Sequence, residues 1–586
     1  MESRNIHYVM GTKPVWVSLL FLFSLISCSS SAIAPQDPDV VWNRVGYFPG
    51  SEKWAAIRNT TADTFKILNA EDDSIYYTGS IEGEPVYDSL SGDQVLRFDF
   101  SDVRQEGRYK IHIPDLNFTS AAFTIGYDMY DDELKHALRS YYLQRCGTEI
   151  TDEDWSRTAC HLNDAPLLNQ QSQKVETTGG WHDAGDYNKF VVTTAVSAGM
   201  LMQLYELDPD HFGQFSLNIP ESGNGMPDLL DEVKWALDWL LRMQKDDGGV
   251  YFKVSQKGWT GEYLPQKDPE TRYIFEVSST ATAGTAAVLA QGARLFKPYN
   301  ATYASRLLDA AQKSWSWLEK YPDIVPEGGF TNPEGVHGGE YHDWQDLDER
   351  LWASAELYKT TGGSKYLDFF SSNYTSIAGG GFGFPILSWQ STGSLAMASI
   401  LSSDDKPVPD EIRNHIINRS KQYGDDVLQQ IDANPYRYVL TEDNFYWGSN
   451  SVAMGYTFDL VNIWRATGED RFRDAAAEQL DYIFGRNPFG LAYVTSERQG
   501  WVQQPYHQWV MTSGKNKPLE GMLVGGPNNR SEMRRPPNHS YPARWYRDDH
   551  KEYTVNEVAI NYTAPHAYVL GFFTLSEDRQ LITQYR

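Results

Sequence analysis

The amino-acid sequence predicts a mainly α-helical protein, a barrel of helical hairpins, preceded by a small β-sandwich. Three observations lead to this prediction. The 586 residues are 41% hydrophobic and 14% aromatic, which is ample for a large packed core. Hydrophobic residues alternate with a period of two between about residues 39 and 126, as they do in half-buried strands. From about residue 127 onward they recur with the period of helices.

The first residues have the pattern of an export signal. The apolar run "VWVSLLFLFSLIS", residues 15–27, is too short to span a bilayer, and no second apolar stretch of spanning length follows it. It ends in "LISC", which resembles the lipobox motif of bacterial lipoproteins. In that motif the signal peptide is cleaved before the cysteine, and the cysteine is lipidated. We therefore expect a signal peptide at 1–27, a lipid anchor on Cys28 and a flexible tether at 28–38; an ordinary signal peptide is the alternative. The protein would be exported and held at a membrane through the lipid alone.

The charge of the chain restricts its partners. A formal net charge of −27 argues against nucleic acid and anionic lipid, because phosphate binding requires clustered Lys and Arg. A neutral ligand fits better. The 18 Trp and 36 Tyr suit a sugar, since flat aromatic rings stack on the apolar faces of pyranoses. Aromatic residues also fill protein cores, so composition alone leaves both interpretations open.

Residues 39–126 are predicted to form the β-sandwich. Leu96 and Phe98 share one face of "QVLRFDF", and Ile111 and Ile113 share one face of "GRYKIHI". With "WAAIRN", "TFKILNA", "SIYYTGS" and "AAFTIG", these segments make six or seven short strands separated by Gly, Asp and Pro turns. Short alternating strands in this number are typical of a small sandwich.

Residues 127–586 are predicted to be helical. In "DLLDEVKWALDWLLRMQ", Leu230, Val233 and Leu237 fall on one stripe, and Pro227 suits a first helical turn. About a dozen helices, with no strand pattern between them that would indicate a parallel sheet, can close into a barrel of hairpins. Similar helical stretches lie at 131–145, 192–206, 279–297, 302–319, 348–361, 391–401, 409–430, 451–466, 469–484 and 557–575. The long loops expected to form a groove are 250–275, 327–347, 433–450 and 487–550.

Two acids crowd into an open turn in "GGWHDAGDYNKF", residues 179–190. Asp183 and Asp186 lie between glycines, which leave the backbone accessible to a ligand. Far away in the sequence, Glu557 follows Asn556 at the head of a predicted helix. Cleavage of a glycosidic bond needs one protonated carboxyl group for the leaving oxygen and one carboxylate that activates water. Asp186 and Glu557 suit these roles, and solvated turn acids are the alternative.

Several motifs resemble glycoside hydrolase family 9. They are "WHDAGDYNKF", "WGSNS", "QLDYIFGRNPFG", "GMLVGGPN" and "NEVAINYTAP", in the family's order over nearly all of 39–586. The resemblance is to β-1,4-glucanases with an N-terminal immunoglobulin-like domain, and it implies an (α/α)6 barrel and hydrolysis with inversion. It implies Asp186 as the catalytic base, Asp183 as its partner in holding the attacking water, and Glu557 as the general acid. We expect an endo-β-1,4-glucanase acting on cellulose, mixed-linkage glucan or xyloglucan.

Two cysteines and one histidine precede the acidic turn in the sequence, and a second histidine belongs to it. Cys146, Cys160, His161 and His182 make a complete tetrahedral set for zinc. In an exported protein a Cys146–Cys160 disulfide is the usual alternative, and the residues alone leave the two readings about even. The resemblance favours zinc, because family members of this type carry a structural zinc at these motif positions. Such a metal would orient Asp183, the next residue.

A second acidic group lies in "HDWQDLDERLWASAELY", residues 342–358. Acids before a helix are favoured by its dipole, which is the simple explanation. The resemblance implies instead a calcium ion near Asp348 and Glu349, and oxygen-rich loops suit that ion.

Four residues are expected to contact the sugar. The resemblance places Trp389, Trp447 and Tyr562 along the substrate groove, although each ring would suit the core equally well. His507 in "QPYHQW" lies in a segment where the family usually has Pro-His-His-Arg.

The sequence departs from the family beside the scissile bond. Tyr506 and Gln508 replace the usual His and Arg, and Phe252 stands where many relatives have His. We expect Phe252 and Tyr506 to form an apolar wall for a decorated glucan such as xyloglucan or for a modified sugar. The alternative functions are a surface glycan-binding protein with weak or vestigial hydrolysis and an exo-acting β-glycosidase on a modified glucan. A monomer is expected in each case.

Overall fold

A computed structural model describes residues 39–586 except 164, 260, 378–380, 384–385, 404, 533–535, 537 and 586. These described residues belong to one compact unit. The expected signal peptide, the tether and Cys28 lie outside them. Across the described ranges, no helix combines the length and the apolar character that crossing a bilayer requires.

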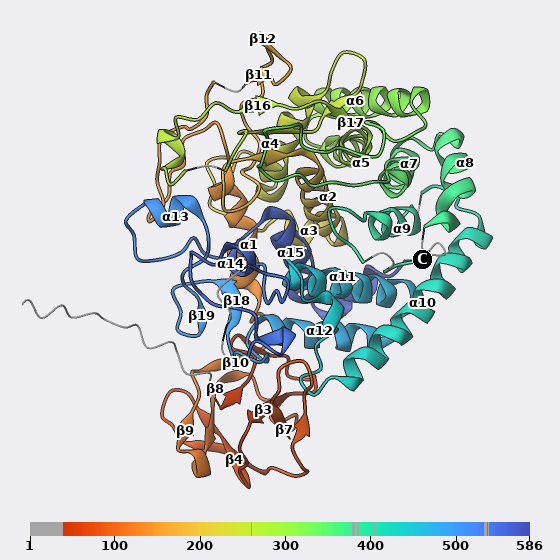
Figure 1. The fold of residues 1–586 in the computed structure, drawn as a ribbon. Coiled ribbons are helices and arrows are strands. Elements are labelled where there is room, and N and C mark those ends of the chain that lie inside the picture. The colour runs from red at the N-terminus through yellow and green to blue at the C-terminus, as the bar shows by residue number, and fades with distance from the viewer. Residues whose placement is uncertain are drawn as a thin grey trace, which may run out of the picture. The chain divides into compact units, whose positions relative to one another are not determined.

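The described chain begins with a β-sandwich, drawn in red and orange in Figure 1. One sheet has the order β1 (Val40–Val41), β3 (Trp54–Arg58), β7 (Gln94–Asp99), β6 (Val86–Tyr87). The other has the order β2 (Gly46–Tyr47), β10 (Phe123–Ile125), β8 (Gly107–Ile113), β4 (Thr64–Asn69), β5 (Ile75–Ser80), with β9 (Phe118–Thr119) paired to β8. The predicted alternation is confirmed, because Leu96, Phe98, Ile111 and Ile113 are buried between the sheets.

Six helices form a closed ring around the core of the second part. Contacts run from α2 to α5, α7, α9, α11, α15 and back to α2, so the ring closes. These helices are buried over most of their surface, as expected of helices that are apolar on nearly every face. They are α2 (Val191–Leu207), α5 (Ser279–Phe296), α7 (Leu347–Thr361), α9 (Gly393–Leu401), α11 (Ser449–Thr467) and α15 (Ile560–Thr574).

A second set of helices packs against the outside of this ring. In the described chain α1 contacts α15, α4 contacts α2, α6 contacts α5, α8 contacts α7, and both α10 and α12 contact α11. They are α1 (Asp131–Gln144), α4 (Asp228–Met243), α6 (Ala301–Lys320), α8 (Ser364–Asn373), α10 (Asp410–Ala433) and α12 (Asp470–Ile483). The (α/α)6 barrel is therefore confirmed. Helix α8 was not predicted, because Tyr366 and Phe370 are its only buried residues and give a weak apolar stripe.

Short elements lie in the loops between these helices. The strands are β11 (Pro166–Leu167), β12 (Gln170–Lys174), β13 (Lys189–Phe190), β14 (Val250–Tyr251), β15 (Lys253–Ser255), β16 (Tyr273–Ile274), β17 (Val277–Ser278), β18 (Ala492–Thr495) and β19 (Trp501–Val502). The helical turns are η1 (Pro114–Leu116), α3 (Pro209–Phe212), η2 (Pro265–Lys267), η3 (Tyr374–Ser376), η5 (Glu442–Asn444), α13 (Gln508–Thr512), η6 (Pro542–Arg544), α14 (Tyr553–Asn556) and α16 (Glu577–Ile582).

Buried polar contacts join the sandwich to the barrel. The Asn43 side chain donates to Asp481 Oδ1 at 2.7 Å. Arg544 in η6 forms an ion pair of 2.5 Å with Asp93, and both side chains are buried. Because such groups are expensive to leave unpaired, these contacts fix how the two parts pack.

Candidate active site

The turn that carries Asp183 and Asp186 is closed by its own backbone. The N–H of Asp183 donates to the carbonyl of Asn188 at 2.9 Å, and β13 then leads directly into α2. A Cβ added at Gly185 would lie 2.4 Å from the carbonyl oxygen of Tyr506. Glycine is therefore required here, because the backbone of a distant segment passes against the turn.

The segment around Glu557 is paired to this turn. Ala184 forms an antiparallel bridge with Ala559, and the N–H of Ile560 donates to the Asp183 carbonyl at 2.9 Å. Glu557 lies in extended backbone between α14 and α15, three residues before α15 begins. The prediction that Glu557 heads the helix is therefore wrong, and strand-like pairing fixes its position instead.

Burial raises the pKa values of all three carboxyl groups. Burial raises the pKa of Glu557 well above its usual range, and the charges of Asp186 and Asp183 raise it further. Burial likewise raises the pKa of Asp183 to about 7. Burial also raises the pKa of Asp186, against hydrogen bonds from Asn188 and the charges of Arg272 and Lys253. Burial and the two aspartates thus favour the protonated form of Glu557, whereas hydrogen bonds to Asp183 and Asp186 oppose the effect of burial on these two acids and favour their anions.

Both carboxylate oxygens of Asp183 receive hydrogen bonds from side chains. Thr193 on α2 donates to Oδ1, and the Tyr341 hydroxyl donates to Oδ2 at 2.6 Å. Tyr341 has a φ of +49°, the left-handed region that a tyrosine rarely adopts. Its ring is held by contacts with Phe190 and Trp389 at centroid distances of 4.5 and 4.9 Å. Such strain at a site residue indicates that the surrounding packing holds its hydroxyl on Asp183.

The predicted stacking residues lie around this site to different extents. Trp447 is 41% exposed, and its ring lies 5.8 Å from that of Tyr553. Tyr562 lies within range of the charges of Glu557 and Asp183, which, after burial, raise its pKa. Trp389 is partly buried against Tyr341. Trp447 is therefore the most accessible of the three predicted rings.

The expected apolar wall of the site needs correction at Phe252, and His507 is also buried. His507 is 1% exposed, and its Nε2 lies 3.0 Å from Gln144 Oε1, so it supports the turn from behind. Phe252 is also 1% exposed and stacks on Phe330 at 3.9 Å, so its ring belongs to the core. A hydrogen bond to Gln144 places His507 and stacking on Phe330 places Phe252, and no local sequence pattern indicates such long-range contacts.

Tyr506 does lie at the carboxyl groups. It forms a parallel bridge with Glu557, and the charges of Glu557 and Asp186 contribute to raising its pKa to about 12, after burial as the largest cause. Gln508 Nε2 donates to the Tyr506 hydroxyl at 3.4 Å. Two of the three departures from the family therefore lie next to the carboxyl groups.

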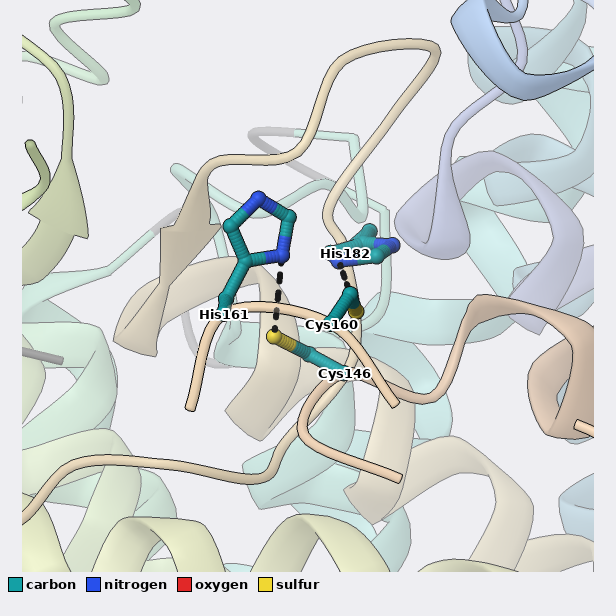
Figure 2. A group of neighbouring side chains, drawn as sticks. All are labelled: Cys146, Cys160, His161 and His182. Atoms are coloured by element: carbon teal, nitrogen blue, oxygen red, sulfur yellow. Dashed lines mark hydrogen bonds between the residues drawn. The ribbon is translucent and has the colours of Figure 1, made fainter. Parts of the chain in front are cut away.

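The four predicted zinc ligands form one cluster, shown in Figure 2. Their ligand atoms all lie within 4.8 Å of one another. Cys146 Sγ is 3.8 Å from His161 Nδ1, and Cys160 Sγ is 3.8 Å from His182 Nε2. Both cysteines are free thiols, so the alternative disulfide is not formed. Tetrahedral zinc, at about 2.3 Å from sulfur and about 2.0 Å from nitrogen, needs ligand atoms about 3.3–3.8 Å apart, and the two thiol–imidazole pairs match this separation.

Neighbouring side chains orient the cluster. His161 Nε2 lies 3.3 Å from Asp268 Oδ2, which also accepts from Gln256 Nε2 at 2.7 Å. Arg272 and Arg157 donate to the sulfur atoms of Cys146 and Cys160, respectively. Carboxylate partners behind a histidine ligand are typical of metal sites.

The second acidic group is buried. Asp348 Oδ2 accepts from the N–H of Thr392 at 2.7 Å, which ties the start of α7 to α9. One carboxylate oxygen each of Asp343, Asp348 and Glu349 is buried without a hydrogen-bond partner in the described chain. Buried carboxylate oxygens without a hydrogen-bond partner suit a hard cation such as calcium.

Sequence reasoning did not find Thr193, Tyr341 or Tyr553. Thr193 lies in a helix whose apolar sequence is typical of a protein core, and Tyr341 lies in a Gly-rich loop. The only signal was the length of the loop 327–347, which carries Tyr341, since loops of that size are usually functional; Tyr553 lies outside the predicted loops.

Comparison with known proteins agrees with this arrangement. The model described as glycosyl hydrolase family 9 matches residues 130–570, and that of the cellulase N-terminal ig-like domain matches 35–117. The chain is 32% identical over 548 residues to Endoglucanase D of Acetivibrio thermocellus, covering 92% of this chain and 83% of that protein. It is 31% identical to the xyloglucan-specific endo-beta-1,4-glucanase BoGH9A of Bacteroides ovatus, covering 94% and 96%. The crystal structure of a metagenome-derived glycoside hydrolase family 9 endoglucanase superposes with a TM-score of 0.84 at 34% identity, covering 91% and 98%.

Proposed function

Because the chain belongs to glycosyl hydrolase family 9 and is an inverting endo-β-1,4-glucanase, we propose that Asp183, Asp186 and Glu557 carry out its reaction. Asp186 is the base that activates water, Asp183 helps to hold that water, and Glu557 is the general acid. One observation carries this assignment: Glu557 is the carboxyl group whose pKa the two aspartates raise, across segments that the backbone pairs together.

The reaction follows from these protonation states. The water oxygen bonds to the anomeric carbon while the bond from that carbon to the glycosidic oxygen breaks. The proton of Glu557 passes to the leaving oxygen, and a proton of the water passes to Asp186. The hydrogen bonds from Asn188 to both carboxylate oxygens of Asp186 favour its anionic form before the step.

We propose a β-1,4-glucan with side branches as the preferred substrate. Tyr506, Tyr553 and Trp447 form a row of rings with centroid distances of 5.9 and 5.8 Å, beginning beside Glu557. Flat neutral rings accept sugars of varied substitution. The similarity to a xyloglucan-specific enzyme supports this choice.

We propose that Cys146, Cys160, His161 and His182 hold a structural zinc ion. The donor set leaves no open position for chemistry, so the ion would fix the loop in which His182 precedes Asp183. We also propose calcium at Asp348 and Glu349, supported by their unpartnered oxygens. Metal analysis of the purified protein tests both, with about one zinc per chain expected.

We propose that the chain is exported, lipidated on Cys28, active as a monomer and bound to a membrane through the lipid alone. The support is the "LISC" sequence after an apolar run. Labelling with a radioactive fatty acid tests it, since Cys28→Ser should abolish the label.

The central experiment compares substrates and a variant. Release of reducing ends is measured on xyloglucan, barley glucan and cellulose, for the wild type and for Glu557→Gln. We expect the variant to lose at least about 100-fold in rate. Equal traces from both proteins, with retained binding to the polysaccharide, would support the glycan-binding alternative.

A further inference from the structure

Asn556, the residue before Glu557, has a side-chain amide whose hydrogen-bonding groups are all engaged. Asn556 is fully buried. Its Nδ2 donates to the Gln504 carbonyl at 2.6 Å and to Asp548 Oδ1 at 3.1 Å. Its Oδ1 accepts from the Tyr546 hydroxyl at 2.6 Å. Both hydrogens and the oxygen of the amide are therefore engaged, which allows one orientation only.

These hydrogen bonds join three segments, of which that of Gln504 lies 52 positions before Asn556. Asp548 also accepts the backbone N–H groups of Gln503 and Gln504, each at 2.9 Å. The Asn556 carbonyl accepts the N–H of Tyr506 at 2.9 Å. The backbone next to Glu557 and the loop segment that carries Tyr506 are thus held in one frame.

Tyr546 is itself firmly placed. Its ring is 3% exposed and packs edge-on against Phe489 and Tyr493, at 5.7 and 5.1 Å. Two residues earlier, Arg544 is paired with the buried Asp93 of the sandwich. The hydroxyl that binds Asn556 therefore projects from a rigid support, which is what precise positioning requires.

We propose that Tyr546 and Asn556 are positioning residues that aim the carboxyl group of Glu557 at the leaving oxygen. Neither residue gives or takes a proton in the reaction. Their effect comes from fixing the backbone of residues 556 and 557, since a displacement of about 1 Å at a reacting group costs up to about 100-fold in rate. This inference rests on the proposed role of Glu557 as the general acid.

The chain offers a matched pair of variants. Tyr546→Phe removes the hydroxyl that donates to Asn556 and keeps the ring. Tyr493→Phe, in the same aromatic cluster, removes a buried hydroxyl that does not bind Asn556. Melting temperatures of both variants report any general damage to the fold.

Dependence on the leaving group separates aiming of the acid from damage to the fold. A cello-oligosaccharide needs protonation of its leaving oxygen, whereas 2,4-dinitrophenyl β-cellobioside hardly does. We expect kcat of Tyr546→Phe to fall about 10-fold or more on the oligosaccharide, but less than about 3-fold on the activated substrate. Tyr493→Phe should match the wild type on both. Glu557→Gln should show the same selectivity in stronger form.

The outcomes are distinct. Equal losses of Tyr546→Phe on both substrates, or no loss on the oligosaccharide, would overturn the positioning role while leaving the proposed function intact. A Glu557→Gln variant without leaving-group selectivity would overturn the general-acid assignment, and the inference with it.

Discussion

The hydroxyl of Tyr341 offers the sharpest test of how the water-activating side of the site works. Tyr341→Phe removes the donor that lies 2.6 Å from Asp183 Oδ2 and keeps the ring between Phe190 and Trp389. The hydrogen bond favours the charged form of Asp183, so its loss must raise a pKa that burial already raises to about 7.

The size of the effect follows from the kind of bond. A hydrogen bond to a charged, buried group contributes about 1.5–3 kcal/mol, and about 1.4 kcal/mol corresponds to one pKa unit. Asp183 must be ionised to hold the water, and activity is lost as the pH falls through its pKa. A higher pKa therefore moves the acidic limb of the pH profile of kcat/KM upward, by about 1–2 pH units.

The assay is the pH dependence of kcat/KM for the wild type and the variant on one soluble glucan. Tyr358→Phe is the control, because its partly buried hydroxyl donates to the Pro407 carbonyl instead. An acidic limb that stays in place in Tyr341→Phe, with activity otherwise retained, would refute the role assigned to this hydrogen bond.

Three further perturbations have defined outcomes. Cys160→Ser should abolish stoichiometric zinc and lower the melting temperature by several degrees, because it removes one of four donors; equal melting of metal-free and metal-loaded wild type would contradict this. Trp447→Ala should raise KM about 3- to 10-fold with little change in kcat, as loss of a stacking ring does. Asp93→Asn breaks a buried ion pair and should lower the free energy of unfolding by about 3 kcal/mol in denaturant titrations. As the control for Asp93→Asn, Asp73→Asn at the exposed pair with Lys110 should change the free energy of unfolding by less than about 1 kcal/mol.

The sequence alone determined the architecture because periodicity is a local property. Alternation in the first strands and the stripes of the helices follow directly from which side chains must be buried. The elements α5 and α7, for example, begin within one residue of their predicted starts. The candidate acids and the Cys and His residues also stood in recognisable motifs.

Only the tertiary structure decided which of these residues meet. Glu557 reaches Asp183 through a strand-like bridge between Ala184 and Ala559, which no helix pattern indicates. His507 and Phe252 are buried and Tyr506 is at the carboxyl groups because loops from different hairpins pack together. Thiol and imidazole groups separated by up to 36 positions converge for the same reason. Local propensity fixes elements, whereas long-range packing fixes contacts between loops, and the chemistry of this protein lies in those contacts.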